Sequence, residues 1–333
     1  MKKFIFKVLL WVIFCLLVCI LPSYFVDPYN VYHWDNIRDN GIEPNKNYIK
    51  TLYILNNPDK FNGYIFGSSR VGSIHVENIT DYKIYNMTYS LGTPHENLET
   101  LQTFIQNGVK IDIVYLGVDS YSYTEDSSEH NEQSLRASYQ YLTKDLRNMI
   151  YMYMDPSLTM QSIEIMLEKK DIGGMDVFYD YGWWCNYNRE TSIDWENARA
   201  SCGKSFLIEE TLEDIAEIKA LCDENDIKLV VFTNPMYELT YEESVERLDY
   251  LYFLERLASI TDYYNFSGLN AITTDTDNYI DTSHYNAYVG DLLINTMVYN
   301  QTDENMQEEG FGFGVTENNV HELLEILQSQ LTE

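Results

Sequence analysis

Short apolar runs alternate along most of the chain with longer segments in which apolar residues stand three or four positions apart. The short runs predict strands at residues 64–66, 83–87, 111–116, 229–232 and 263–266. The longer segments predict helices near residues 94–107, 212–222, 242–260 and 286–299. Residues 229–232 are apolar throughout, as in a parallel strand that is covered on both faces. This alternation predicts an α/β sheet with right-handed crossovers.

The alternation stops between Tyr121 and Ser201. Residues 134–154 and 158–169 have helical spacing, and an aromatic cluster ending in Trp183-Trp184 follows them. We interpret residues 121–205 as a helical insertion. It lies either over the face where the strands end, where it shapes substrate entry, or on the sheet edge with the tryptophans in its core.

The insertion interrupts an α/β domain that we place at residues 27–300. Asp27-Pro28-Tyr29-Asn30 is a turn-like entry to this domain, and the polar stretch up to Asn57 is expected to drape over it. Residues 301–333 form an acidic tail, with a predicted helix from near Glu317 to Leu331.

The first 26 residues have a different character. Lys2, Lys3 and Lys7 precede an apolar run from Val8 to Leu21, which continues to Val26. A membrane span needs about 20 apolar residues, and this segment supplies them if Lys7 snorkels to the interface. Because the lysines all precede the run, the N-terminus is expected in the cytoplasm and the rest of the chain outside it.

Two other kinds of export segment, a cleaved signal peptide and a lipoprotein signal, fit the sequence less well than an uncleaved anchor. A cleaved signal peptide needs a small-residue cleavage site, for which Leu21-Pro22-Ser23-Tyr24 is a poor substitute. A lipoprotein signal needs small residues before its cysteine, and Leu17-Val18 before Cys19 are not small. The pattern therefore favours a single-pass protein of the cell membrane with an extracytoplasmic C-terminal domain.

The charge of the chain argues against some classes of ligand. The formal net charge is −30, and the part beyond the anchor carries 19 Lys and Arg against 52 Asp and Glu, or −33. Such a surface disfavours nucleic acids and other polyanions as tightly bound ligands. No C-x-x-C motif or zinc-ligand spacing is present, so neither a metal nor a cofactor is expected. In an exported domain Cys185 and Cys202 could form a disulfide.

Candidate chemistry begins at Gly67-Ser68-Ser69-Arg70, which follows the first predicted strand directly. Glycine permits a tight turn, and a serine at the carboxyl end of a parallel strand lies at the edge of the sheet where ligands bind. A helix that starts nearby would also point N–H groups at this place. By itself the motif is equally an ordinary turn.

The second candidate is Asp281-Thr282-Ser283-His284, far downstream. A carboxylate three residues before a histidine can reach the Nδ1–H of the ring and fix its tautomer. Nε2 is then free to act as a base, which a serine nucleophile requires. The alternative is a purely structural hydrogen bond between aspartate and histidine.

Together the two motifs, and their order along the chain, resemble those of the SGNH hydrolases. Gly67-Ser68-Ser69 matches the Gly-Asp-Ser block of that family, which implies Ser69 as the nucleophile, and Asp281 to His284 matches its Asp-x-x-His block. Residues 86–92 approximate the glycine block, which implies Gly92 as an oxyanion donor. The resemblance covers about residues 64–299 and implies a three-layer, flavodoxin-like parallel sheet.

The sequence departs from the family pattern at three places. Ser68 replaces the usual aspartate, and Arg70 follows the nucleophile. Asp119 stands where the family has an asparagine, and a carboxylate cannot donate to an oxyanion unless it is protonated. Asn234, after the next strand, is a candidate substitute, although Asn234-Pro235 is equally a plain turn. Ser68, Arg70 and Asp119 are therefore expected only to line the site.

The anchor and the two motifs look most like a narrower group within that superfamily, the D-alanine transfer protein of teichoic-acid synthesis and the alginate acetylation proteins. This resemblance implies an esterase or O-acyltransferase that acts on a cell-surface or secreted glycopolymer beside a membrane-bound O-acyltransferase. Ser69, His284 and Asp281 would be its catalytic residues. Two alternatives stay open: a non-catalytic assembly partner of such an acyltransferase, and a surface carbohydrate-binding module that uses its tyrosines and Trp183-Trp184.

Overall fold

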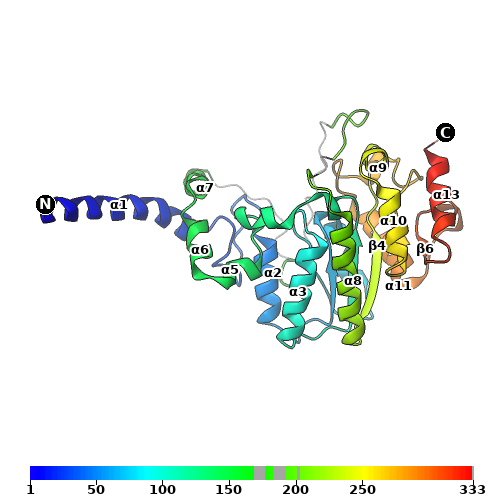
Figure 1. Cartoon of the computed structure of the whole chain (residues 1–333), viewed down its shortest axis with the longest axis horizontal. Helices are drawn as coiled ribbons and strands as arrows, with labels where there is room; N and C mark the ends of the chain where they lie inside the picture. Colours follow the sequence, from blue (N-terminus) through cyan, green and yellow to red (C-terminus); the bar gives the residue numbers. More distant parts are fainter. Residues whose placement is uncertain (169–176, 183–192, 201–202, 332–333) are drawn as a thin grey trace. The chain divides into compact units, whose positions relative to one another are not determined.

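The computed structural model describes the whole chain except residues 169–176, 183–192, 201–202 and 332–333 (Figure 1). The chain divides into two compact units. Residues 1–53 and 129–175 form the first, which we call the N-terminal unit. Residues 54–128 and 176–333 form the second, which we call the sheet unit. The anchor segment and most of the predicted insertion thus share one unit.

The sheet unit is built on a mixed sheet with the strand order β2-β1-β3-β4-β5-β6. Its strands are β1 (Gly63–Phe66), β2 (Ile84–Asn86), β3 (Ile113–Val118), β4 (Lys228–Thr233), β5 (Tyr263–Asn265) and β6 (Phe313–Val315). The first five run parallel, and β6 pairs antiparallel with β5. The predicted α/β fold and its five strands are confirmed. β6 was not predicted, because three residues beside two glycines carry no readable alternation.

Both faces of the sheet are covered, as the side chains of β1 show. Tyr64 and Phe66 lie 5.3 and 6.4 Å, between ring centroids, from Phe104 of α3 (Pro94–Gln106). Ile65, between them, belongs to the core cluster on the other face with Leu293 of α11 (Ala287–Tyr299). Successive residues of a strand point to opposite faces, so one short strand contacts both helical layers. α8 (Ile208–Glu224) lies beside α3 (Figure 1).

The helix predicted over residues 242–260 is two helices, α9 (Glu238–Arg247) and α10 (Tyr250–Ala258). Asp249 between them has φ 51°, in the left-handed region that aspartate tolerates better than most residues. The acidic tail is part of the sheet unit, since it contributes β6 and its terminal helix packs against α10. The described part of this unit also contains the α-helices α4 (Tyr121–Thr124), α12 (Glu304–Glu308) and α13 (Val320–Gln330).

The N-terminal unit contains α1 (Lys2–Val26), α5 (Tyr139–Lys144), α6 (Leu146–Tyr153) and α7 (Pro156–Leu167). Residues 134–154 were predicted as one helical segment, but the chain breaks it at Asp145. The backbone of Asp145 is extended, and its carboxylate accepts the N–H of Arg147 to cap α6. The polar stretch up to Asn57 was predicted to drape over the domain, but it contains a helix near its end. Residues 46–55 form α2, in which Ile49 and Ile54 are fully buried.

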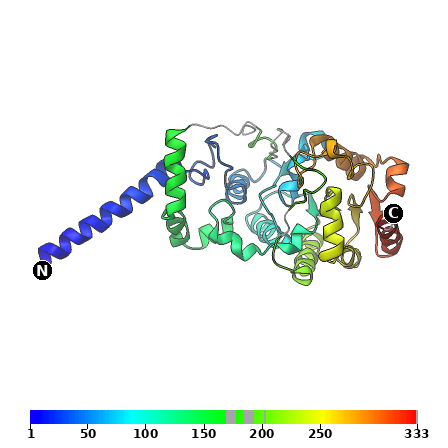
Figure 2. The same cartoon turned by 90° about the horizontal axis from the view of Figure 1, so that it is seen from above.

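α1 is long and apolar enough to cross a membrane, with a mean hydropathy of 3.0. It ends at Asp27, which adopts φ 51°. The Asp27 carboxylate then accepts the N–H groups of Val31, Tyr32 and His33, which makes the predicted turn a rigid exit from the helix. α7 packs against α1 and lies across its C-terminal end (Figure 2).

Candidate active site

The predicted nucleophile lies in a turn that only glycine allows. Gly67 follows β1 with φ 149°, and a Cβ atom there would lie 2.9 Å from the carbonyl oxygen of Gly117. A short 3₁₀ helix then runs from Ser69 to Ser73. The Oγ of Ser68 caps this helix by accepting the N–H of Arg70 at 3.4 Å, so its role is structural. Ser69 begins the helix and is half-exposed.

Residues after β2 hold this turn from the other side. The Oγ1 of Thr88 donates to the carbonyl oxygen of Ser68 at 3.0 Å, and the Nδ2 of Asn86 donates to that of Val71 at 2.7 Å. A Cβ at Gly92 would lie 2.5 Å from the carbonyl oxygen of Gly67. The segment that approximates the glycine block of the family therefore packs directly on the nucleophile turn.

The Asp281-to-His284 segment forms a closed loop before α11. The N–H of Ile280 donates to the carbonyl oxygen of His284 at 2.8 Å, which brings the two ends of the loop together. Inside it, the Oδ1 of Asp281 accepts the N–H groups of Ser283 and His284 at 2.7 and 2.8 Å. The carboxylate thus shapes the loop besides contacting the imidazole ring.

The structure brings Ser69, His284 and Asp281 into one line of hydrogen bonds. The Nδ1 of His284 lies 2.9 and 2.8 Å from the two carboxylate oxygens of Asp281. Its Nε2 lies 2.8 Å from the Oγ of Ser69. With the ring proton on Nδ1, facing the carboxylate, Nε2 is the free base that accepts the hydroxyl proton. The three residues have the geometry of a Ser-His-Asp triad.

Burial and hydrogen bonding act on Asp281 in opposite directions. Burial raises the pKa of its carboxyl group. The hydrogen bond and charge of His284, together with the N–H groups of the loop, lower this pKa by more than burial raises it, so the net pKa lies below the ordinary value. The carboxylate is therefore charged at neutral pH and can stabilise an imidazolium. The side chains of His284 and Asp281 are 31% and 35% exposed, so both residues reach the surface of the sheet unit.

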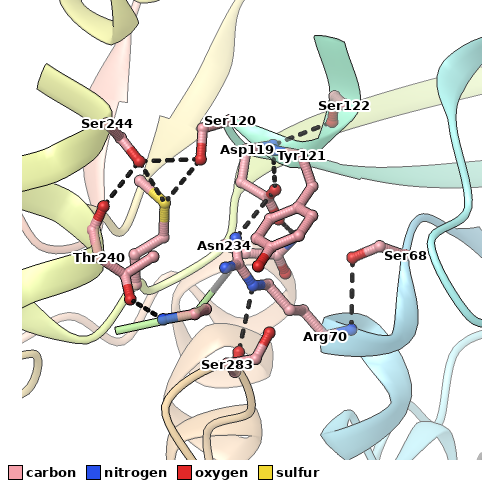
Figure 3. A network of polar contacts seen from close by, with 12 residues as sticks. Ser68, Arg70, Asp119, Ser120, Tyr121, Ser122, Asn234, Thr240, Ser244 and Ser283 are labelled. Carbon is pink, nitrogen blue, oxygen red and sulfur yellow. Dashed lines mark hydrogen bonds and ion pairs between the residues drawn. The ribbon is translucent and has the colours of Figure 1, made fainter. Parts of the chain in front are cut away.

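Behind the triad, Arg70 and Asp119 form a buried ion pair (Figure 3). The two side chains are each 1% exposed, and the Nη1 of Arg70 lies 2.9 Å from the Oδ1 of Asp119. The Nε of Arg70 donates to the carbonyl oxygen of Ser283 at 3.1 Å. The guanidinium also lies over the ring of Tyr121, 4.3 Å from its centroid. Arg70 thus ties the nucleophile turn to the histidine loop.

Asn234 completes this network. Its Nδ2 donates to the Oδ2 of Asp119 at 2.8 Å, and its Oδ1 accepts the hydroxyl of Tyr285 at 3.3 Å. The amide is fully buried, and Asp119 and Asn234 bind each other. Neither side chain presents a donor to the triad. The structure therefore gives no support to Asn234 as an oxyanion donor or to Asp119 as a residue that lines the site.

Main-chain groups are the better candidates for binding an oxyanion. The N–H of Ser69 forms no hydrogen bond with the residues that the structure describes, and it opens the 3₁₀ helix. The N–H of Gly92 makes a long hydrogen bond of 3.4 Å to the carbonyl oxygen of Tyr89 and is close to the nucleophile turn. These two groups remain the predicted donors.

Several contacts in this region were not anticipated from the sequence. Tyr121, Tyr285 and the carbonyl oxygen of Ser283 hold the buried network, and only the last lies within a recognised motif. Within the described part of the chain, no group of three or more His, Cys, Asp or Glu side chains could hold a metal ion. Cys185, Cys202 and Trp183-Trp184 lie outside the described residues.

Comparison with known proteins adds no relative to this picture. No protein-family model, no curated protein and no solved structure matches the chain.

Proposed function

We propose that the sheet unit is a serine esterase or O-acyltransferase of the SGNH type. The observation that carries the proposal is the 2.8 Å contact between the Nε2 of His284 and the Oγ of Ser69, with Asp281 on the other ring nitrogen. Ser69 and His284 are 215 positions apart in the chain, so their contact does not follow from local structure. Activated serine nucleophiles have this arrangement on unrelated folds.

The first half of the reaction transfers the acyl group to the enzyme. The Oγ of Ser69 forms a bond to the ester carbonyl carbon while its proton passes to the Nε2 of His284. Asp281 stabilises the imidazolium, and the main-chain N–H groups of Ser69 and Gly92 bind the oxyanion. The imidazolium then protonates the leaving alkoxide as the ester C–O bond breaks, which leaves an acyl-serine.

The second half releases the acyl group to a hydroxyl. Water or a polymer hydroxyl attacks the acyl-serine and gives its proton to His284, and the Oγ of Ser69 leaves and recovers a proton. Attack by water is hydrolysis, and attack by a sugar hydroxyl is transfer. Both outcomes need the same residues, so the acceptor decides between them.

A surface glycopolymer is the substrate class that we propose, and acetyl is the acyl group. The partial exposure of His284 and Asp281 supports a large substrate, since these residues are not enclosed in a cavity. The apolar α1 supports a location at the cell membrane, and the lysines before its apolar run support a sheet unit outside, where such polymers are made and modified. A membrane-bound O-acyltransferase is the proposed partner, because it could supply activated acyl groups.

Hydrolysis of an aryl acetate by the purified full chain tests the chemistry. Ser69→Ala should lower the rate more than about 10³-fold, because it removes the nucleophile. Ser128→Ala, at an exposed serine of the sheet unit, is the matched control and should keep the wild-type rate. A Ser69→Ala protein as active as the wild type would refute the proposed nucleophile.

One observation favours the second candidate, a non-catalytic assembly partner of an acyltransferase. Asp119 and Asn234, the side chains nearest in role to the family's third oxyanion donor, bind each other instead. A wild-type chain that is inactive on every ester, yet co-purifies with a membrane-bound O-acyltransferase equally well with and without Ser69→Ala, would support this role.

A further inference from the structure

Apolar side chains are exposed along one side of α7, in the N-terminal unit. Met160, Ile163, Met166 and Leu167 are between 38% and 83% exposed. Positions 160, 163 and 167 are three and four residues apart, so they line up along the helix, and 166 borders them. Leu158, Thr159 and Ser162 form the buried side. We call the four exposed residues the α7 stripe.

The short helix before it, α6, also has exposed apolar side chains. Leu146, Ile150 and Tyr151 of α6 are exposed, by 73%, 45% and 63%. α6 and α7 pack against each other, and both contact α1. Surface apolar residues are usually scattered, and a cluster of this kind is a mark of an interaction site.

The α7 stripe lies at the end of the membrane helix. The Oγ of Ser23, in the last turns of α1, lies 3.3 Å from the Oγ1 of Thr159 of α7. The buried side of α7 is thus held against the last turns of α1, and Ile163 and Met166 stay exposed on the same helix. Because α7 lies across the end of α1, a span by α1 would leave α7 along the membrane surface (Figure 2).

Aromatic side chains surround the same exit. The ring centroids of Tyr24 and Tyr32 are 5.0 Å apart, and those of Tyr32 and Tyr153 are 4.9 Å apart. Tyr24, Tyr32 and Phe25 are exposed. Aromatic rings with one polar end are enriched where a protein crosses the membrane–water interface.

The two units also differ in net charge, and the difference favours membrane contact by the N-terminal unit. Outside the anchor, the N-terminal unit carries 8 Lys and Arg against 11 Asp and Glu, or −3. The sheet unit carries 11 against 41, or −30. An anionic membrane surface repels strong negative charge, so the nearly neutral unit is the one suited to contact it.

We propose that α6 and α7 are a second membrane-binding element, in which the α7 stripe is buried at the boundary between lipid headgroups and acyl chains. The occupant of this surface is the lipid bilayer itself. A helix with one apolar side that continues from a membrane span is suited to lie in the interface plane. The proposal rests on α1 as the span and is independent of the esterase chemistry.

Fluorescence quenching by lipid measures the contact directly. The full chain is placed in nanodiscs of phosphatidylcholine, with or without brominated acyl chains, as wild type, Ile163→Trp and Met166→Trp. The fluorescence that each substitution adds over wild type should fall at least about twofold in the brominated discs, because the added indole meets acyl chains. Both positions are exposed, so a larger side chain at either one should leave the protein folded.

Tyr288→Trp, at an exposed tyrosine of α11 in the acidic sheet unit, is the control and should add fluorescence that bromine leaves unchanged. Equal quenching at all three positions would overturn the proposal, since the contact would not be specific to the α7 stripe. Indoles at 163 and 166 that acrylamide quenches and brominated lipid does not would also overturn it. That result would place the stripe in water.

Discussion

The Nε of Arg70 donates a 3.1 Å hydrogen bond to the carbonyl oxygen of Ser283. Arg70 directly follows the predicted nucleophile, and Ser283 directly precedes the predicted base, His284. The buried partner of Arg70, Asp119, fixes the guanidinium in place. Two loops that are far apart in sequence are thereby held at the separation that the serine–histidine contact needs. We regard Arg70 as a positioning residue, not a catalytic one.

Arg70→Lys tests this role, because lysine keeps the charge but cannot bridge Asp119 and Ser283 in the same planar geometry. We expect kcat for aryl acetate hydrolysis to fall about 10- to 100-fold, since small misplacements of catalytic groups have effects of that size. KM should change less. Arg247→Lys, in an exposed ion pair with Glu243, is the control and should match the wild type.

A double variant separates position from stability. Arg70→Met with Asp119→Leu removes both buried charges, so the fold should survive better than with Asp119→Leu alone, which leaves an unpaired buried charge at a cost of about 3–5 kcal/mol. The esterase rate should stay low in the double variant. A double variant with the wild-type rate would show that the pair serves the fold alone.

The identity of the nucleophile is tested by a fluorophosphonate probe. Ser69 should be labelled in the wild type, and labelling should disappear in Ser69→Ala and in His284→Ala, which lacks the base. Ser68→Ala should still be labelled, because the Oγ of Ser68 only accepts a 3.4 Å hydrogen bond from the N–H of Arg70. Labelling that is lost in Ser68→Ala and kept in Ser69→Ala would mean that the family block is misaligned by one residue.

Asp281→Asn should affect both the rate and the stability, because the carboxylate contacts the imidazole and caps its loop. The amide presents the wrong hydrogen-bonding group to Nδ1, and we expect the esterase rate to fall about 10²-fold. The amide oxygen can still accept the N–H groups of the loop but carries no charge, and these weaker hydrogen bonds should lower the free energy of unfolding by about 1 kcal/mol. Paired measurements of rate and urea unfolding on one preparation check both effects. An unchanged rate would remove Asp281 from the mechanism.

His95 of α3 and Asp214 of α8 should make part of the stability pH-dependent. The hydrogen bond to Asp214 raises the pKa of His95 to about 9, against the opposing effect of burial. A raised pKa means that the stabilisation is fully present below the pKa of the unfolded imidazole, about 6.5, and is lost as the pH rises through about 9.

The variant His95→Gln measures that contribution. The difference in urea midpoint between wild type and His95→Gln should be largest at pH 6 and should vanish by about pH 10. The same comparison is made at pH 6, 8 and 10 on one preparation of each protein. A His95→Gln difference that is constant with pH would mean that the ion pair contributes nothing to stability.

The predicted orientation of the chain in the membrane rests on the three lysines before the apolar run. Protease added outside intact cells should digest the sheet unit, and the mature protein should keep its first residues. A sheet unit that is protected until the cells are lysed would reverse the predicted orientation. A mature N-terminus after Leu21 would make the segment a cleaved signal.

The sequence was sufficient to predict the five parallel strands, because short apolar runs between helical segments usually form buried strands. It also supplied the two motifs around Ser69 and His284, since a glycine turn after a strand and an aspartate three residues from a histidine are local patterns. The amphipathic α2 was missed because its buried side includes polar residues such as Lys50 and Thr51. Asp249 and Asp145 broke predicted helices, because the ends of helices depend on single backbone angles.

Only the tertiary structure decided what the polar residues near the triad do. In the sequence Asn234 was equally open to an oxyanion role or a plain turn, and Asp119 was expected only to line the site. In the structure the Nδ2 of Asn234 donates to the Oδ2 of Asp119. Arg70 could be placed near the serine from its position, but its partners Asp119 and Ser283 are 49 and 213 residues away. The spacing of apolar residues along the sequence indicates on which face of its helix or strand a side chain lies. The partner of a buried charge is set by the crossing of strands and loops, which no local pattern encodes.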